Sequence, residues 1–348
     1  MNDAPQRDEA RFVRRVLIAA AIAGGILLLW QLRQVVVLLF GAAMVATIFR
    51  SISDLIQKHL RLPERIAVLL SVLLIIGVIA GVVWSIGSQV GAQSQQLADM
   101  LPRAEQMIDA KLAGMGLGHP VVRWMNEIHA GGLIGGNLKG VLSSVTFSVA
   151  SFLIVFFGGI FLAAEPRLYG IGLLKLVPPP KRRLIAEAME ESDHALRLWL
   201  KGQLAAMILI FLMTWLGLWL LGVPSALVLG LISGVLEFIP YAGAITSSIP
   251  AIMVALVQGP ELALWVVGLY VVVHHVEAYL VQPLIQQYAV EIPAVITLFA
   301  LLAFGLLFGI LGVLLAAPLA VVSYVLVKRL YVIEALDTPT PIPGEDKA

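Results

Sequence analysis

The stretch GVLEFIPYAG, residues 234–243, lies near the middle of a long apolar run. As one helix, the roughly 33 residues from 225 to 257 would extend about 50 Å, whereas the hydrocarbon core of a bilayer is about 30 Å thick. The run is too long for one crossing, yet two crossings and a turn need more than about 40 residues. Pro240, Tyr241 and Gly243 interrupt it, so we expect a broken, re-entrant hairpin over residues 225–257.

A single carboxylate, Glu237, lies just before this break. Non-helical backbone at membrane depth is found only where protein or a water-filled cavity surrounds it, and an ionisable residue there indicates a functional site. We therefore interpret Glu237, with Pro240, Tyr241 and Gly243, as part of a substrate-binding or ion-binding site. The alternative is structural: the carboxylate hydrogen-bonds free backbone groups at the break and stabilises the bend. The sequence leaves both interpretations open.

Composition places the chain in the membrane. Hydrophobic residues make up 60% and charged residues 13% of it, and the mean hydropathy is +0.95. A soluble globular protein is far more charged. The basic residues lie in loops, where membrane orientation explains them, so no nucleic-acid partner is indicated and membrane lipids are the expected surroundings. The absence of Cys excludes disulfides, thiolate metal sites and cysteine nucleophiles.

The order of apolar and charged segments predicts an all-α polytopic membrane protein with eight hydrophobic segments. About six are full spans and two are re-entrant hairpins, with a small extracytoplasmic helical insert. The expected units are a cytoplasmic N-terminus (1–15), four scaffold helices (16–164) including the insert (87–140), a cytoplasmic amphipathic segment (165–202), a transport unit (203–330) with hairpins at 225–257 and 293–327, and a disordered cytoplasmic tail (331–348). Within the scaffold we expect a tight connection at 31–34 and a return helix at 35–49.

The second hairpin is expected because residues 293–327 form another over-long apolar stretch. Its heptapeptide GLLFGIL (305–311) is similar to GLISGVL (230–236) of the first, which suggests an internal repeat. Hairpins that enter from opposite leaflets are typical of inverted-repeat transporters. Hinging or close packing is expected at six positions: Gly230, Gly234, Gly305, Gly309, Gly312 and Pro318.

Polar residues also concentrate in the inner half of the apolar segment 262–280. Tyr270, His274 and Glu277 are spaced i, i+4 and i+7, so they share one face of a helix. We add His274, Glu277, Gln282 and Pro283 to the candidate site for a substrate or ion. A structural alternative is that Glu277 pairs with a neighbouring histidine to hold helices together.

No motif for enzymatic chemistry is present. The sequence contains neither GxxxxGK[ST] nor HExxH. His274 and Glu277 on one helix are at most half of a metal site, and Ser233 and Ser248 have no protease motif around them. We therefore expect no enzymatic activity, no catalytic residues, no cofactor and no metal.

Four segments resemble a known family. They are GVLEFIPYAG (234–243), IPAIMVALVQG (249–259), HHVEAYLVQPLIQQYAVEIPAVITL (274–298) and GILGVLLAAPLAVV (309–322). In this order they resemble the autoinducer-2 exporter (AI-2E) family of bacterial membrane transporters. The resemblance implies a secondary transporter of the inner membrane with cytoplasmic termini, which exports a small polar signal or exchanges cations for protons. It also implies a homo-oligomer, with a pentamer as one possibility, and elevator-like movement.

Two other functional classes remain open from the sequence. The chain could be a non-transporting membrane scaffold or regulator that binds partners through its insert or its basic cytoplasmic segment. It could also be a channel, because hairpin tips can line a pore. Substrate flux separates transport from the first class, and single-channel conductance identifies the second.

Overall fold

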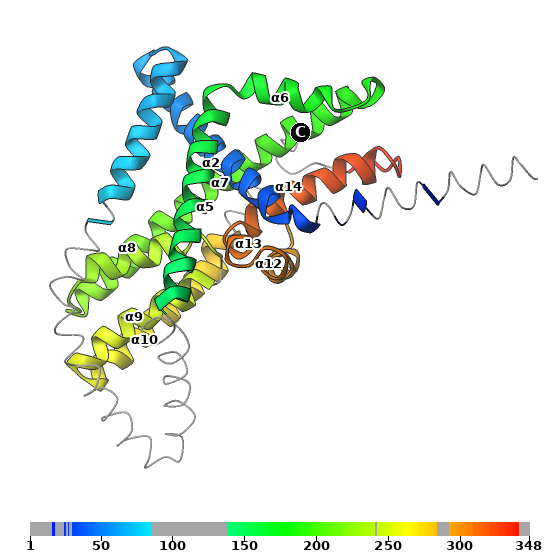
Figure 1. Cartoon of the computed structure of the whole chain (residues 1–348). Helices are drawn as coiled ribbons and strands as arrows, with labels where there is room; N and C mark the ends of the chain where they lie inside the picture. The colour runs from blue at the N-terminus through cyan, green and yellow to red at the C-terminus, as the bar shows by residue number, and fades with distance from the viewer. Residues whose placement is uncertain are drawn as a thin grey trace, which may run out of the picture.

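The structure is a computed structural model that describes residues 31–81, 83–84, 138–240, 242–283 and 292–340, and a few positions between 16 and 30. The described part is helical without β-strands (Figure 1). It contains five helices that are long and apolar enough to cross a membrane. The prediction of an all-α polytopic membrane protein is confirmed. Tyr241, most of the predicted insert and the two chain ends lie outside the described residues.

The scaffold side is built on α2 (Arg33–Leu60), which packs along α5 (Leu138–Ala164). The two helices approach closely at Gly159, where a side chain would meet Val45. The helix Glu64–Gly81 joins them through a shared apolar cluster. The cluster consists of Ala46, Phe49, Val68, Val72 and Ala163.

The boundaries expected for the first return helix are wrong. Helix α2 begins at Arg33, inside the expected connection, and continues beyond residue 49 to Leu60. It ends where Arg61 adopts a left-handed conformation with φ of 53°. The charged residues after position 49 are good helix formers, so their polarity marks the exit from the apolar layer and not the end of the helix.

The cytoplasmic amphipathic segment expected at residues 165–202 is divided differently. After α5, the helix α6 (Pro166–Lys175) turns away by 92°. Residues 182–202 then belong to α7 (Arg182–Leu220), a continuous helix of 39 residues that also contains the start of the expected transport unit. The apolar face of its charged half, including Leu196 and Trp199, is buried in the protein core and does not face a membrane surface.

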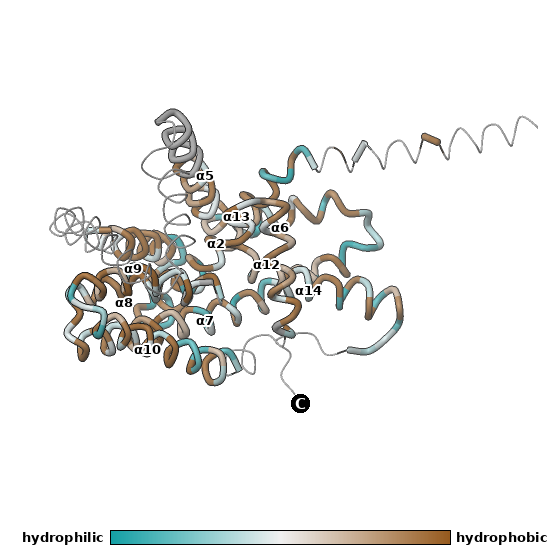
Figure 2. The backbone as a smooth tube through the Cα atoms, turned by 90° about the horizontal axis from the view of Figure 1, so that it is seen from below, coloured by the Kyte–Doolittle hydropathy of each residue, from teal (hydrophilic) through white to brown (hydrophobic). Residues whose placement is uncertain are grey.

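The first apolar stretch forms two helices, α8 (Ala226–Leu236) and α9 (Ala242–Gln258), joined by a short break. They lie beside α10 (Pro260–Val276) in both views of the molecule (Figures 1 and 2). Figure 2 shows that these helices are largely hydrophobic. Gly230 and Gly234 of α8 pack directly against Trp215 and Phe211 of α7.

The second apolar stretch also breaks, into α12 (Ala294–Phe308), α13 (Ile310–Leu314) and α14 (Ala316–Val327). The breaks are at Gly309, where φ is 67°, and at Leu315. Pro318 is buried close to the second break, but it lies in the first turn of α14, where a proline without an N–H is tolerated. A π-helical turn (Lys328–Ile333) follows.

Candidate functional site

Two glutamates that are 40 positions apart in sequence meet inside the protein. Glu237 follows the last residue of α8, and Glu277 begins a π-helical turn, Glu277–Val281, at the end of α10. Both side chains have an exposed fraction of 0%. Their carboxyl groups are near enough to interact electrostatically. The helix break and the π turn thus bring two buried acids together.

A direct hydrogen bond between the two carboxyl groups would require a proton, because two ionised carboxylates can only accept. With both groups ionised, none of their four oxygens has a hydrogen-bond partner within the described part of the chain. Two adjacent buried negative charges without compensation cost several kcal/mol. No Lys or Arg in the described ranges forms an ion pair with either glutamate. A proton shared by the pair, or a cation bound between its oxygens, removes that cost.

His274 connects the pair to the surface. Its Nδ1 atom is 3.5 Å from Oε2 of Glu277, and 42% of its side chain is exposed. His275 points elsewhere, with Nδ1 2.7 Å from the carbonyl oxygen of Val271 one turn earlier. Of the two neighbouring histidines, only His274 is placed to exchange a proton with the buried acids.

The break beside Glu237 is closed by tight backbone packing. A methyl group at Gly243 would overlap the carbonyl oxygen of Leu236 and lie 2.7 Å from Cα of Glu237, so only glycine allows α9 to start here. Pro240 is buried in the turn. The side-chain amide of Gln203 on α7 donates a 2.6 Å hydrogen bond to the backbone carbonyl of Glu237.

This arrangement bears on the structural interpretation of Glu237. A helix end leaves carbonyl groups without partners, and at this break an amide from α7 satisfies one of them. In the residues described, the Glu237 carboxylate itself makes no hydrogen bond to backbone groups of the turn. The carboxyl group therefore faces Glu277 and is free for a proton or a cation.

The π turn has a parallel role at Glu277. Single π turns within α-helices widen the helix and occur frequently at functional sites. Here the turn also precedes Gln282, whose side-chain nitrogen is buried without a partner in the described region, and the half-buried Pro283. The π turn thus places two polar side chains without hydrogen-bond partners among the residues described, those of Glu277 and Gln282, at the same end of α10.

Hydrogen bonds of one tyrosine also join α8, α9 and α10 near the glutamates. The hydroxyl of Tyr270 on α10 is 2.9 Å from Oγ of Ser233 on α8, and it donates a 3.3 Å hydrogen bond to the carbonyl of Ser247 on α9. All three residues are buried. Ser233 lies one helical turn before Glu237, so these contacts fix α8, α9 and α10 next to the carboxyl pair.

The structure therefore brings together Glu237, Pro240, Gly243, His274 and Glu277 from the predicted site. Sequence reasoning missed Gln203 and Ser247, and it considered Ser233 only as a nucleophile. The one available signal was polarity: each is a polar residue on a largely apolar helix. Nothing local in the sequence shows that their partners lie on other helices.

The expected hinge positions have different environments. Gly230 and Gly234 are contact points between α8 and α7. Gly305 faces Val313 of α13, and a methyl at Gly312 would overlap the carbonyl oxygen of Phe304. Gly309 provides the positive φ at the break. Close backbone approach is thus seen at Gly230, Gly234 and Gly312.

The fold and this site define a polytopic α-helical membrane protein with a buried acidic pair at a helix break. The sequence model of the "AI-2E family transporter" matches residues 17–331. The chain belongs to this family.

Curated relatives have corresponding names. "Putative transport protein YrrI" of Bacillus subtilis is 27% identical over 214 residues, which cover 61% of this chain and 60% of that protein. "Putative transport protein MT0215" of Mycobacterium tuberculosis is 42% identical over 103 residues, 29% of this chain and 28% of that protein. "Putative permease PerM" of Escherichia coli is 29% identical over 186 residues, 53% and 51% of the two chains. The chain thus spans less than two thirds of each relative.

Proposed function

We propose that this protein is a secondary transporter of the bacterial inner membrane in which Glu237 and Glu277 together bind the coupling proton or cation. The observation that carries the proposal is the meeting of two fully buried carboxyl groups with no lysine or arginine ion-paired to either among the residues described. Such a pair has two low-energy states, one with a proton and one with a bound cation. Exchange between those states couples the binding of one ion to the release of the other.

The helix break supports a transport path at this site. In membrane transporters, broken helices place substrate and ion sites at the ends of half-helices, where free backbone groups coordinate ions. Glu237 lies at such an end, and Glu277 lies at the π turn opposite. The partly exposed His274 next to Glu277 offers a route by which protons reach the pair.

Two kinds of cargo fit this proposal. One is a small polar metabolite or signal of the autoinducer-2 type, exported at the expense of the ion gradient. The other is a cation exchanged directly for protons. The acidic pair supports ion binding in both cases. Elevator-like movement of the unit 203–330 against the scaffold, homo-oligomer formation and cytoplasmic termini complete the proposal. The separate apolar cluster around α8–α10 supports independent movement of that part of the unit, whereas α14 shares a cluster with α2.

The test is flux in proteoliposomes that contain the purified protein and a pH-sensitive dye. Proton-coupled transport of Na⁺, K⁺ or autoinducer-2 is measured for the unchanged protein and for Glu237→Gln and Glu277→Gln. Glutamine keeps the shape of the side chain but cannot ionise. We expect each substitution to lower coupled flux roughly tenfold or more and to abolish its pH dependence.

The matched control is Glu261→Gln, an exposed glutamate in the first turn of α10. It removes the same charge from the same helix, so flux and pH profile should stay unchanged. Unchanged flux and pH profile in both buried-site variants would contradict the proposed coupling site. Absence of flux for every cargo in the unchanged protein would favour a scaffold or regulator, and single-channel conductance would identify a channel.

A further inference from the structure

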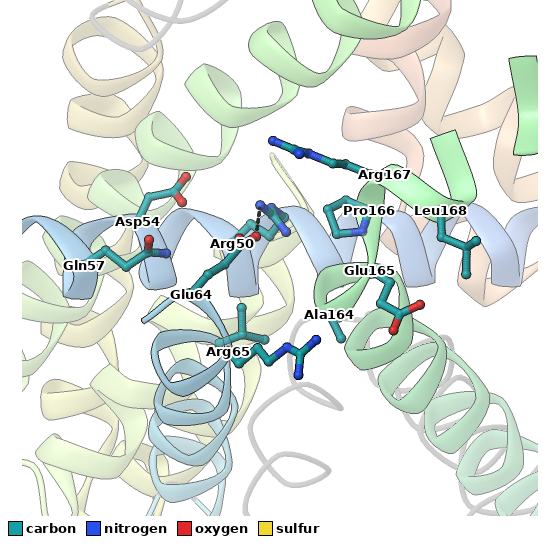
Figure 3. Close-up of a pocket in the computed structure, with 11 residues that line it drawn as sticks. Arg50, Asp54, Gln57, Glu64, Arg65, Ala164, Glu165, Pro166, Arg167 and Leu168 are labelled. Carbon is teal, nitrogen blue, oxygen red and sulfur yellow. Dashed lines mark hydrogen bonds and ion pairs between the residues drawn. The ribbon is translucent and has the colours of Figure 1, made fainter. Parts of the chain in front are cut away.

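A cavity of about 840 Å³ lies at the corner where α5 ends and α6 begins, away from the glutamate pair. Figure 3 shows its lining, which also includes the second half of α2 and the start of the helix Glu64–Gly81. Charged side chains dominate one part of the lining. They are Arg50, Asp54, Glu64, Arg65, Glu165 and Arg167.

These charges are not equally engaged. Arg50 donates 2.9 Å hydrogen bonds to Glu64 and to the carbonyl oxygen of Ala163. Asp54 accepts a 3.0 Å hydrogen bond from Arg197 of α7. These acids are therefore neutralised within the protein, and Arg50 has a structural role at the end of α5.

The two remaining arginines of the cavity are available to a ligand. Among the described residues, neither Arg65 nor Arg167 forms an ion pair, and Glu165 is the remaining unpaired acid of the lining. In Figure 3, Arg65 and Arg167 lie on either side of the Arg50–Glu64 ion pair. The lining has as many acids as arginines, but Arg65 and Arg167 are the two guanidinium groups that no acid of the described residues engages.

The surroundings of the cavity indicate its depth in the membrane. The helix Glu64–Gly81 and α5 are apolar helices of spanning character, and the first begins and the second ends at this corner. From there α6 leaves at 92° to α5, with Leu168, Ile171 and Leu173 exposed. A short helix with exposed apolar side chains, perpendicular to a span, is typical of the membrane interface. The cavity is therefore at the level of the lipid headgroups.

We propose that this cavity binds the headgroup of an anionic phospholipid, with its phosphate between Arg65 and Arg167. Guanidinium groups bind phosphate oxygens with paired hydrogen bonds, and basic pockets between membrane helices on the cytoplasmic side are suited to anionic headgroups. Exposed apolar side chains continue from the cavity along both spans, including Leu69 and Leu73 on one and Phe161 on the other. Acyl chains fit this surface, which a free phosphate ion does not require.

The test measures lipid binding to the full chain in a neutral detergent by native mass spectrometry. The protein is titrated with phosphatidylglycerol, with phosphatidylcholine and with inorganic phosphate. The double variant Arg65→Gln/Arg167→Gln should bind phosphatidylglycerol roughly tenfold more weakly. Glu165→Gln, which removes the unpaired acid, should bind it more tightly than the unchanged protein.

The matched control is Lys175→Gln/Lys181→Gln, which removes two positive charges from exposed positions outside the cavity lining. It should change phosphatidylglycerol binding less than twofold. All five substituted sites are exposed, and a monodisperse elution profile confirms that each variant is folded.

Several outcomes would overturn the proposal. Equal weakening by the two double variants would show general attraction to the basic face. Equal affinity for phosphatidylcholine would remove the role of headgroup charge. Competition by inorganic phosphate at the concentration at which phosphatidylglycerol binds would identify a site for the free ion.

Discussion

The hairpins α8–α9 and α12–α13 share a backbone device but differ in chemistry. In each, a glycine lets one arm touch a backbone carbonyl of the other: Gly243 against Leu236, and Gly312 against Phe304. The tip of the first hairpin carries a buried carboxyl group that faces another helix. The second stretch, residues 293–327, has no charged residue.

This difference between the two hairpins shows that bending the chain back and binding an ion have separate requirements. An over-long apolar run with glycines is sufficient to bend the chain back on itself. Ion chemistry needs, in addition, a carboxylate at the tip and partners from other helices, here Gln203 and Glu277. We therefore expect the second hairpin to act as an apolar wall or gate of the path, whereas the first holds the ion.

The largest expected effect is the all-or-none labelling of introduced cysteines. It tests on which side of the membrane the two ends of each hairpin lie. The chain has no Cys, so single cysteines can be introduced at its flanks. Pro224→Cys and Glu261→Cys flank the first hairpin, and Pro293→Cys and Tyr331→Cys flank the second. An impermeant maleimide should label the first pair only from outside and the second pair only from the cytoplasm. Labelling of the two members of a pair from opposite sides would mean that the stretch crosses the membrane.

The next effect concerns the device that the hairpins share. Gly243→Ala and Gly312→Ala each force a methyl group into a backbone carbonyl, and we expect each to cost about 3 kcal/mol or more of folding free energy. The control Gly268→Ala on α10 meets nothing within 4 Å and should be neutral or stabilising by up to about 1 kcal/mol. Unfolding followed by tryptophan fluorescence measures all three. A loss confined to Gly243→Ala would show that the hairpins do not share this packing.

The smallest effect concerns the anchor that the first hairpin has and the second lacks. Gln203→Leu leaves the buried carbonyl of Glu237 without its amide donor, which should cost about 1–3 kcal/mol. Gln57→Leu serves as control, because that side-chain amide bonds to Ser53 one turn earlier on α2 and, among the described residues, to no other group, so the substitution should cost less than about 0.5 kcal/mol. Equal unfolding free energies for the two variants would remove the anchoring role of Gln203.

Much of the fold could be predicted from the sequence, because hydrophobic length and breaking residues are local signals. The position of the break after Glu237 and the interruption of the second stretch follow from them. The length of α7 could not be predicted in this way. An amphipathic charged segment has the same sequence pattern whether its apolar face covers a membrane surface or a neighbouring helix. In the structure that face packs against α2 and α14.

The candidate site was only partly visible for a similar reason. Glu237 and Glu277 stood out as carboxylates in apolar segments. Their direct meeting depends on how α8 packs against α10, and on the π turn that begins at Glu277. Neither the packing of α8 against α10 nor the π turn is marked by a periodic pattern in the sequence. The hydrogen bond from Gln203 likewise joins residues 34 positions apart and could be found only in three dimensions.

The uninterrupted α7 has a mechanical consequence. At its 39 residues the helix is about 58 Å long, nearly twice the thickness of the hydrocarbon core. Near its middle, Gln203 donates a hydrogen bond to the backbone carbonyl of Glu237 at the tip of the first hairpin. Toward its start, Glu187 forms an ion pair with Arg329, beyond α14, and Arg197 forms one with Asp54 of α2. The helix is thus a single stiff lever, and a displacement of the hairpin tip at Glu237 would be transmitted along it to the ion pairs nearer its start.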